Sequence, residues 1–263
     1  MYVDVHTHLT HARFENDYET VIADAKKAGV EAIVVNGLEP TSNRQTLDLA
    51  KRFDNVYPAL GIYPIEAIHP MVKDLNLSNS NFDVDQEIAF IEENAKQDKI
   101  VAIGECGLDG YWVGQETFAE QERVFIELIE IGKRYDKPII IHTRKMEKRA
   151  MEILAHHDAK RVNFHCYCGK VKWAIEAAEQ YNWYFSIPAN ARNNEAFGKM
   201  LQKLPAENIL TETDAPYLAP VRGERNEPAN VVGTVAYLAE LRGLSTAQAK
   251  NLVSDNFRRL FKF

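Results

Sequence analysis

Cysteine is scarce in this 263-residue chain, which contains only Cys106, Cys166 and Cys168. A small, odd number of cysteines argues against a disulfide-bonded scaffold and is typical of a reducing compartment. The chain also lacks an apolar run of about 18 residues, which a membrane-spanning helix would need. Its first twenty residues lack the basic and then apolar pattern of a signal peptide. We therefore expect a cytoplasmic protein that contacts no membrane.

An excess of basic residues is also missing. Lys and Arg number 31 against 38 Asp and Glu, so the formal net charge is −7. This balance argues against broad, non-specific wrapping of nucleic acid, which depends on many Lys and Arg contacts to phosphates. A local cationic patch or a pair of metal ions could still hold a phosphodiester. The composition, 46% hydrophobic and 26% charged, is that of a globular protein with a sizeable core.

Short apolar runs alternate with amphipathic segments along the whole chain. We predict eight strands, at residues 2–8, 31–35, 56–60, 100–104, 137–142, 162–165, 183–186 and 208–214. Helices are expected at residues 16–29, 41–53, 86–97, 115–135, 147–156, 171–180, 194–203, 227–242 and 245–262, the last with Ser245 as its N-cap. A polar segment, 74–85, is predicted to be an excursion or flexible loop.

This alternation implies a parallel sheet, and eight such units at this length imply an α/β protein of the (β/α)8 TIM-barrel class, with residues 1–263 forming a single domain. An open, doubly wound sheet is the alternative. The first strand is not followed by the Gly-rich phosphate-binding turn of that fold.

The first strand ends in two histidines, within Tyr2-Val3-Asp4-Val5-His6-Thr7-His8. Residues i and i+2 of a strand point to the same face, so His6 and His8 present two imidazoles side by side, with Asp4 behind them. Imidazole is a common metal ligand, and a nearby carboxylate could fix its tautomer. The pair alone is also compatible with an edge strand that carries two solvated histidines.

Side chains that can bind metals close five of the predicted strands: His6 with His8, Glu105, His142, His165 and Asp214. In a TIM barrel the carboxyl ends of all strands lie on one rim, where the catalytic groups of such enzymes are found. We therefore predict that these four histidines and two carboxylates converge, and that Asp214 both binds metal and handles protons.

Each of these residues has an ordinary structural explanation when taken singly. His142 could end a core strand, Glu105 could lie in a turn between its flanking glycines, and Asp214 could form an Asx-turn. A zinc site made of His165 and the neighbouring Cys166 and Cys168 would be too compact, because no second cysteine pair is present. We expect the three cysteines to be buried or half-buried thiols.

Six motifs resemble those of the TatD family of metal-dependent deoxyribonucleases, within the amidohydrolase superfamily. They are Asp4-Val5-His6-Thr7-His8, Gly104-Glu105-Cys106-Gly107-Leu108-Asp109, Ile141-His142-Thr143-Arg144, Phe164-His165-Cys166-Tyr167, Glu212-Thr213-Asp214-Ala215-Pro216-Tyr217 and Arg222-Gly223-Glu224-Arg225-Asn226-Glu227-Pro228. They run in family order over essentially the whole chain.

The resemblance implies two divalent cations, Mg, Mn or Zn. His6, His8, Glu105 and Asp214 would hold one, and Glu105, His142 and His165 the other, with Glu105 as the bridge. Such a pair can bind the attacking and leaving oxygens of a displacement at phosphorus.

The implied reaction is hydrolysis of DNA phosphodiester bonds from a 3′ end, on single-stranded DNA or 3′ ends and with no obligate protein partner. Asp214 would be the general base beside the bridging Glu105. Arg144 and Arg222 could contact phosphate, because guanidinium pairs with it bidentately. A surface ion pair is the alternative for either arginine.

The chain departs from the family in Gly61-Ile62-Tyr63-Pro64, where the family commonly has Gly-x-His-Pro. Tyr63 can donate a hydrogen bond or stack on a base but is a poor metal ligand, so we assign it to substrate binding. His69 could compensate for the missing histidine.

Two other functions stay open. One is hydrolysis of a small phosphoester, lactone or amide on the same scaffold, although lactonase and phosphotriesterase relatives often use a carboxylated lysine where this strand has Glu105. The other is an inactive, metal-binding protein that acts through partners, for which no residue gives positive support.

Overall fold

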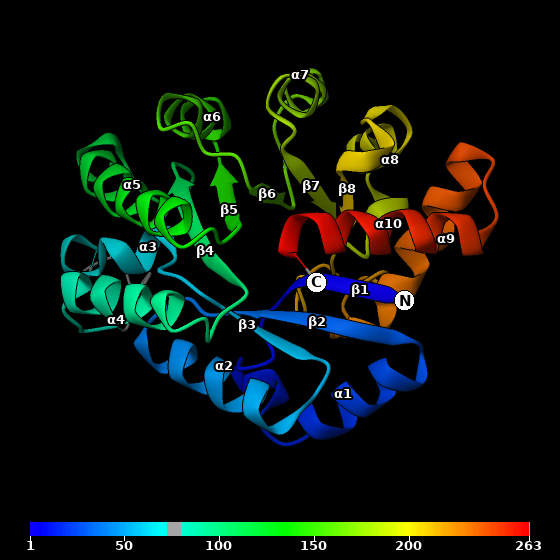
Figure 1. Cartoon of the computed structure of the whole chain (residues 1–263), viewed down its shortest axis with the longest axis horizontal. Coiled ribbons are helices and arrows are strands. Elements are labelled where there is room, and N and C mark those ends of the chain that lie inside the picture. Colours follow the sequence, from blue (N-terminus) through cyan, green and yellow to red (C-terminus); the bar gives the residue numbers. More distant parts are fainter. Residues whose placement is uncertain (73–79, 263) are drawn as a thin grey trace.

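The computed structural model describes residues 1–72 and 80–262. Its eight strands are all parallel and pair in chain order, from β1 to β8 (Figure 1). They are β1 (Tyr2–Thr7), β2 (Val30–Asn36), β3 (Val56–Leu60), β4 (Ala102–Asp109), β5 (Ile139–Arg144), β6 (Val162–His165), β7 (Tyr184–Ile187) and β8 (Ile209–Thr211). The sheet curves into a nearly closed barrel, which confirms the predicted TIM-barrel fold.

Contacts between β1 and the region of β8 join the first and last strands of the barrel. The Thr211 hydroxyl donates to the Val3 carbonyl at 2.9 Å, and Thr7 forms an isolated bridge with Ala215 just past β8. These contacts bring the segment after β8 against β1, where the two predicted histidines lie.

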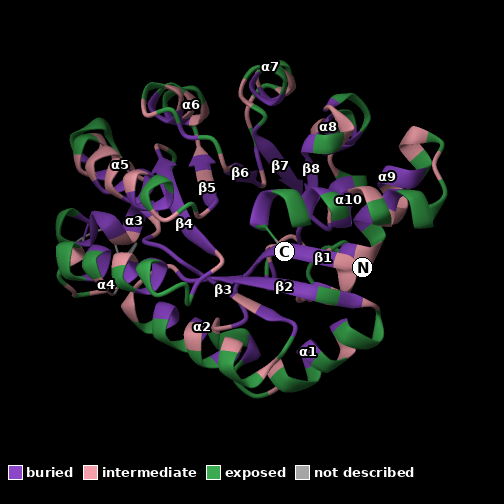
Figure 2. Cartoon of the chain, in the orientation of Figure 1, coloured by how far each residue is buried: buried purple, intermediate pink, exposed green. Residues whose placement is uncertain are grey.

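Helices cover the outside of the sheet (Figure 1). They are α1 (Tyr18–Lys27), α2 (Pro40–Arg52), α3 (Pro64–Ala67), α4 (Val84–Lys96), α5 (Phe118–Arg134), α6 (Glu147–His156), α7 (Val171–Tyr181), α8 (Glu195–Lys203), α9 (Val231–Arg242) and α10 (Thr246–Phe261). In α5 the residues that face β4 recur every three or four positions, as Val124, Phe125, Leu128 and Ile129, and are buried. Figure 2 shows the same division, with buried strands and helices that are exposed on their outer sides.

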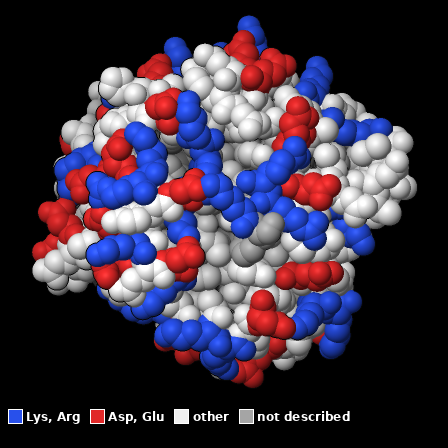
Figure 3. All heavy atoms as spheres, in the orientation of Figure 1, with Lys and Arg blue, Asp and Glu red and all other residues white. Residues whose placement is uncertain are grey.

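The last helix covers the amino end of the barrel. Helix α10 begins at Thr246 and is preceded by Ser245, whose hydroxyl accepts from the Gln248 backbone in a capping box, so the predicted N-cap is confirmed. Near its other end, the Leu260 carbonyl accepts from Arg161 Nε at 3.0 Å, immediately before β6. In Figure 1, α10 lies across the front of the barrel, close to both termini. Basic and acidic side chains are interspersed over this face (Figure 3).

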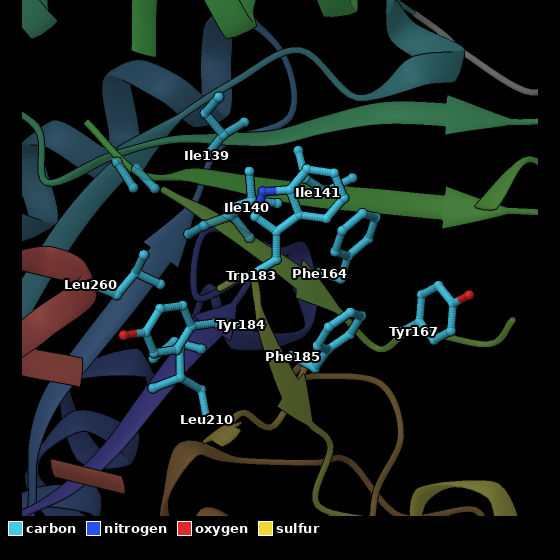
Figure 4. Close-up of a cluster of buried hydrophobic side chains, with 14 of the residues drawn as sticks. Ile139, Ile140, Ile141, Phe164, Tyr167, Trp183, Tyr184, Phe185, Leu210 and Leu260 are labelled. Atoms are coloured by element: carbon cyan, nitrogen blue, oxygen red, sulfur yellow. The ribbon is translucent and has the colours of Figure 1, made fainter. Parts of the chain in front are cut away.

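Aromatic packing fixes β6 and β7. The rings of Phe164 and Phe185 are stacked with centroids 5.2 Å apart, and the Tyr167 ring meets Phe164 edge to face. Trp183 is fully buried and donates its indole N–H to the Ala159 carbonyl at 2.8 Å. Figure 4 shows these rings among the isoleucines of β5. The backbone that carries His165, next to Phe164, is therefore held by a dense core.

Several predicted boundaries were wrong. Strand β4 runs five residues beyond Gly104, whereas β8 ends at Thr211, before Asp214. The helix expected from residue 227 starts as a 3-10 turn, Pro228–Asn230. Of the polar segment 74–85, residues 74–79 lie outside the described part, and Val84 already begins α4. Within the described residues, no helix is both long and apolar enough to cross a membrane.

Candidate metal centre

Four predicted ligands meet at the carboxyl end of the barrel. His6 lies in β1, His8 just after it, Glu105 in β4 and Asp214 past β8. The Nε2 atoms of His6 and His8 are 3.1 Å apart. Glu105 Oε2 lies 3.4 Å from each of these nitrogens, and Asp214 Oδ1 lies 3.6 and 3.4 Å from them. We call this set the first ligand group.

A second ligand group lies on the other side of Glu105. The other carboxylate oxygen of Glu105, Oε1, is 2.9 Å from His142 Nδ1 and 3.1 Å from His165 Nε2. The two imidazole nitrogens are 3.5 Å apart. Glu105 thus turns one oxygen to each group, which is the arrangement of a bridging carboxylate.

The first ligand group fits a divalent cation. Ligands about 2.0–2.1 Å from a tetrahedral centre are roughly 3.3–3.4 Å from one another, and the five distances above span 3.1–3.6 Å. The Nε2 atoms of His6 and His8 face each other and can share only one proton. In addition, Nδ1 of His6 is buried and has no hydrogen-bond partner. Imidazole with carboxylate suits zinc and manganese, among other ions.

Two acceptors orient ligating rings. His8 Nδ1 faces the Asn36 carbonyl at 3.1 Å, and His142 Nε2 faces Asp109 Oδ2 at 3.1 Å. The Glu212 carboxylate lies beside the third ring, with Oε1 3.5 Å from His165 Nδ1, which is an ion-pair distance but not a hydrogen bond. The other oxygen of Glu212 accepts from the Ser186 hydroxyl. Partners of this kind fix which ring nitrogen is directed at a metal.

No role was predicted for Asp109 or Glu212 from the sequence. A signal was present for Asp109, which is four residues from Glu105 on the same strand, because even spacing along a strand places side chains on the same face. Glu212 gave no such signal, because Glu212 and Asp214 lie past the end of β8 and Asp214 has a φ of +57°.

Asp4 does not fix an imidazole tautomer, so that interpretation was wrong. Its carboxylate accepts from the backbone N–H of Thr213 at 2.9 Å, from the Thr213 hydroxyl at 2.5 Å and from the His6 backbone at 3.3 Å. The Asp214 backbone N–H donates to the His6 carbonyl at 2.8 Å. Asp4 therefore fastens the segment that carries Asp214 to β1.

Two glycines allow the strands to approach Glu105. Gly107 has φ +144°, and a Cβ there would lie 2.0 Å from the His142 carbonyl oxygen. At Gly61 a Cβ would lie 2.3 Å from the Glu105 carbonyl oxygen. Only glycine fits at such close approaches.

The electrostatics of the site favour a cation. Burial raises the pKa of a carboxyl group, but the histidines around Glu105, with His165 and His6 foremost, hold its pKa well below the usual value. The pKa of Asp214 is lowered in the same way, against its burial, by the hydrogen bond from His8 and by the neighbouring imidazoles. Both carboxylates are therefore ionised at neutral pH.

The pKa of one imidazole is lowered and the pKa values of the other three are raised. Burial lowers the pKa of His6 to about 4. Burial also acts to lower the pKa of His8, but its bonds to Asp214 and Glu105 prevail and raise it to about 10. The pKa values of His142 and His165 are raised against burial by Asp109, Glu105 and Glu212. A bound cation would have to displace protons from these three rings.

Tyr63 lies beside the second ligand group. Its ring meets the His142 ring edge to face, with centroids 4.9 Å apart. Burial and the charges of Glu105 and Asp109 raise the pKa of the phenol, so it stays neutral and can donate a hydrogen bond. His69 does not replace the missing histidine, because Nδ1 faces the Glu66 carbonyl, Nε2 accepts from a backbone N–H, and the ring stacks on Phe82.

The two arginines differ in position. Arg144 ends β5, and its guanidinium lies 3.6 Å above the Tyr111 ring centroid. It forms no ion pair with a described carboxylate, so the ion-pair alternative fails for it. Arg222 is exposed in the segment after β8 and has neither a hydrogen bond nor an ion pair among the described residues. The structure therefore does not join Arg222 to the ligand groups.

The cysteines take no part in these ligand groups. All three are free thiols. Cys106 is buried and Cys166 half-buried, as expected, but Cys168 is exposed, so the expectation was wrong for Cys168.

A TIM barrel with clustered histidines and carboxylates at the carboxyl end of its strands is the architecture of a metal-dependent hydrolase. A family model described as TatD related DNase matches residues 3–262. The chain belongs to this family and is a metal-dependent hydrolase, which confirms the resemblance seen in the six motifs.

Similar proteins agree with this assignment. The chain is 32% identical to "Uncharacterized metal-dependent hydrolase YabD" of Bacillus subtilis, over 100% of this chain and 99% of that protein. It is 31% identical to "Deoxyribonuclease TATDN3" of Homo sapiens, over 98% and 94%. The crystal structure of YjjV, a TatD homolog from Escherichia coli K12, superposes with a TM-score of 0.85 at 27% identity, covering 100% of this chain and 98% of that one.

Proposed function

We propose that this protein hydrolyses DNA phosphodiester bonds at the 3′ end of an unpaired strand, with two divalent cations held on either side of Glu105. The observation that carries the proposal is the division of the Glu105 carboxylate, with Oε2 toward His6 and His8 and Oε1 toward His142 and His165. The deoxyribonuclease name of the human relative supports DNA as the substrate.

In this proposal the first ligand group holds one cation and the second ligand group holds the other. When bound, such a pair lowers the pKa of water and stabilises the negative charge that develops on the attacking and leaving oxygens. The fold brings the ligands of both groups together, because β1, β5, β6 and the segment after β8 all approach Glu105 on β4.

Asp214 is the proposed general base. Both oxygens of Glu105 face imidazoles, and its side chain is only 4% exposed. Asp214 turns Oδ1 to His6 and His8 and is 14% exposed, which leaves Oδ2 to accept a proton from the attacking water. Its lowered pKa keeps the carboxylate ionised for this task.

Two further side chains are proposed to position the substrate. The neutral phenol of Tyr63 can donate a hydrogen bond to a phosphate oxygen beside His142, and Arg144 can pair with a phosphate from the end of β5. For Arg222 only its position in a family motif supports a substrate contact.

The test uses metal-stripped protein and a 5′-labelled single-stranded oligodeoxynucleotide, with Mg²⁺, Mn²⁺ or Zn²⁺ added back separately. We expect stepwise shortening from the 3′ end that requires the cation and is lost in His142→Ala. Asp214→Asn should lower kcat by about 10²–10⁴-fold, the usual contribution of a general base. His156→Ala, which removes an exposed histidine of α6, is the matched control and should cleave normally.

Cleavage that survives chelation would contradict the metal-dependent mechanism. Turnover of a small phosphoester, lactone or amide, without cleavage of DNA under any cation, would assign the protein to the alternative hydrolase class.

A further inference from the structure

Exposed apolar side chains gather at the carboxyl end of the barrel. Among the described residues, the large hydrophobic side chains that are exposed are Met71, Tyr111, Trp112, Tyr217 and Val221. Met71 follows β3, Tyr111 and Trp112 follow β4, and the other two follow β8. All of them therefore lie in segments that leave the rim on which the metal ligands converge.

The segment with Tyr111 and Trp112 is fastened directly to the metal centre. Asp109 Oδ1 accepts the backbone N–H groups of Tyr111 at 2.8 Å and Trp112 at 3.1 Å, and its other oxygen faces His142. Gln121 holds the Asp109 backbone through two hydrogen bonds, at 2.8 and 3.0 Å. One buried carboxylate thus sets the position of both aromatic residues relative to a ligating ring.

The positively charged side chain of Arg144 lies beside these two aromatic rings. The Arg144 guanidinium lies 3.6 Å from the Tyr111 ring centroid and 5.3 Å from that of Trp112. The two rings meet edge to face, and Tyr111 and Trp112 remain 50% and 48% exposed. Exposed aromatic rings beside an arginine are one means by which proteins bind unpaired nucleotides, because bases stack on the rings while the guanidinium attracts the phosphates.

The opposite side of the metal centre has a different character. A cavity of about 640 Å³ opens there, lined by His8 and Tyr217 among others. Its lining includes four carboxylates, those of Glu15, Glu39, Asp48 and Glu66. Its one arginine, Arg52, is paired with Glu19. One of the four carboxylates, that of Asp48, is paired with Lys51. The carboxylates make this cavity less favourable for a chain of phosphates than the surface beside Arg144, and its volume suits a single small-molecule ligand.

We propose that Tyr111, Trp112 and Arg144 form a subsite for the unpaired nucleotides that precede the bond to be cut. This inference rests on the proposed function. It also orients the DNA strand in the site: the uncut part of the strand lies over the ends of β4 and β5, and the 3′ nucleotide that is released lies toward the cavity near His8. Bases of a duplex are already paired and stacked, so the subsite selects single-stranded ends.

The test measures binding of a fluorescently labelled oligothymidylate in the presence of a chelator, so that no cleavage occurs. Trp112→Ala should weaken binding by about 5- to 150-fold, which corresponds to the loss of one stacked base. Trp112→Phe retains an aromatic face and should restore most of the affinity.

Arg144→Ala should reduce the slope of log affinity against log salt concentration by about 0.7, the value for one phosphate contact with a single strand. Lys250→Ala is the matched control. It removes a cation 5.4 Å above the Tyr2 ring, at the amino end of the barrel, and should leave the affinity and its slope unchanged.

Equal affinity of wild type and Trp112→Ala would overturn the subsite, as would equal affinity of the wild type for oligothymidylate and for an abasic strand of the same length. Failure of the proposed function is a separate result: binding that depends on Trp112, without cleavage under any cation, supports the subsite and refutes the nuclease.

Discussion

Binding of divalent cations to the metal-free protein should release protons in a number that follows from its histidines. At pH 6.5, His6 is already neutral because its pKa is about 4. His8, with a pKa of about 10, is fully protonated. His142 and His165, whose pKa values are raised above 6.5, are each more than half protonated.

Filling both ligand groups at pH 6.5 should therefore release about two to three protons, because only neutral imidazole binds a metal. Glu105 and Asp214 contribute none, since their pKa values are lowered and both are already ionised. Isothermal titration in buffers of different ionisation enthalpy measures the number as the slope of the observed heat. His142→Ala should lower it by at least half a proton.

A release of less than one proton by the wild type would contradict this prediction and mean that the cations do not displace protons from the imidazoles around Glu105.

Three other outcomes follow from the same geometry. Glu212→Gln should weaken metal binding by about 10–100-fold in a competition titration with a chromophoric chelator, because the charged carboxylate lies 3.5 Å from Nδ1 of the ligating His165 ring. Gly107→Ala should lower the free energy of unfolding, measured in urea, by about 1–3 kcal/mol. The loss should be larger than that caused by Gly223→Ala, because Gly223 also has a positive φ but a Cβ there would have no atom within 4 Å. The protonated ring of His8 stabilises the metal-free protein below pH 6.5, and this stabilisation should be lost as the pH rises through about 10; a melting temperature equally pH-dependent in His8→Gln would contradict it.

The convergence of the ligands was predictable because all strands of a TIM barrel point the same way. The i, i+2 spacing placed His6 and His8 together without any knowledge of their neighbours. Where each strand stops was not predictable, since it depends on pairing across the sheet. Strand β4 continues to Asp109 because it pairs with β5 as far as Arg144.

The partners of buried polar groups were beyond the reach of the sequence. Asp4 lies two residues from His6, yet it bonds to Thr213, which is 209 positions away along the chain. His69 was a reasonable substitute for a missing ligand until the structure placed its ring on Phe82. Such contacts depend on which distant segments meet, and a hydrophobic pattern carries no information about that.

Anomalous diffraction tests most directly whether Glu105 bridges two cations, as proposed. Crystals grown with Mn²⁺ should show two anomalous peaks, one between Glu105 and the pair His6 and His8, the other between Glu105 and the pair His142 and His165. A single peak, or peaks that do not contact Glu105, would contradict a bridging Glu105.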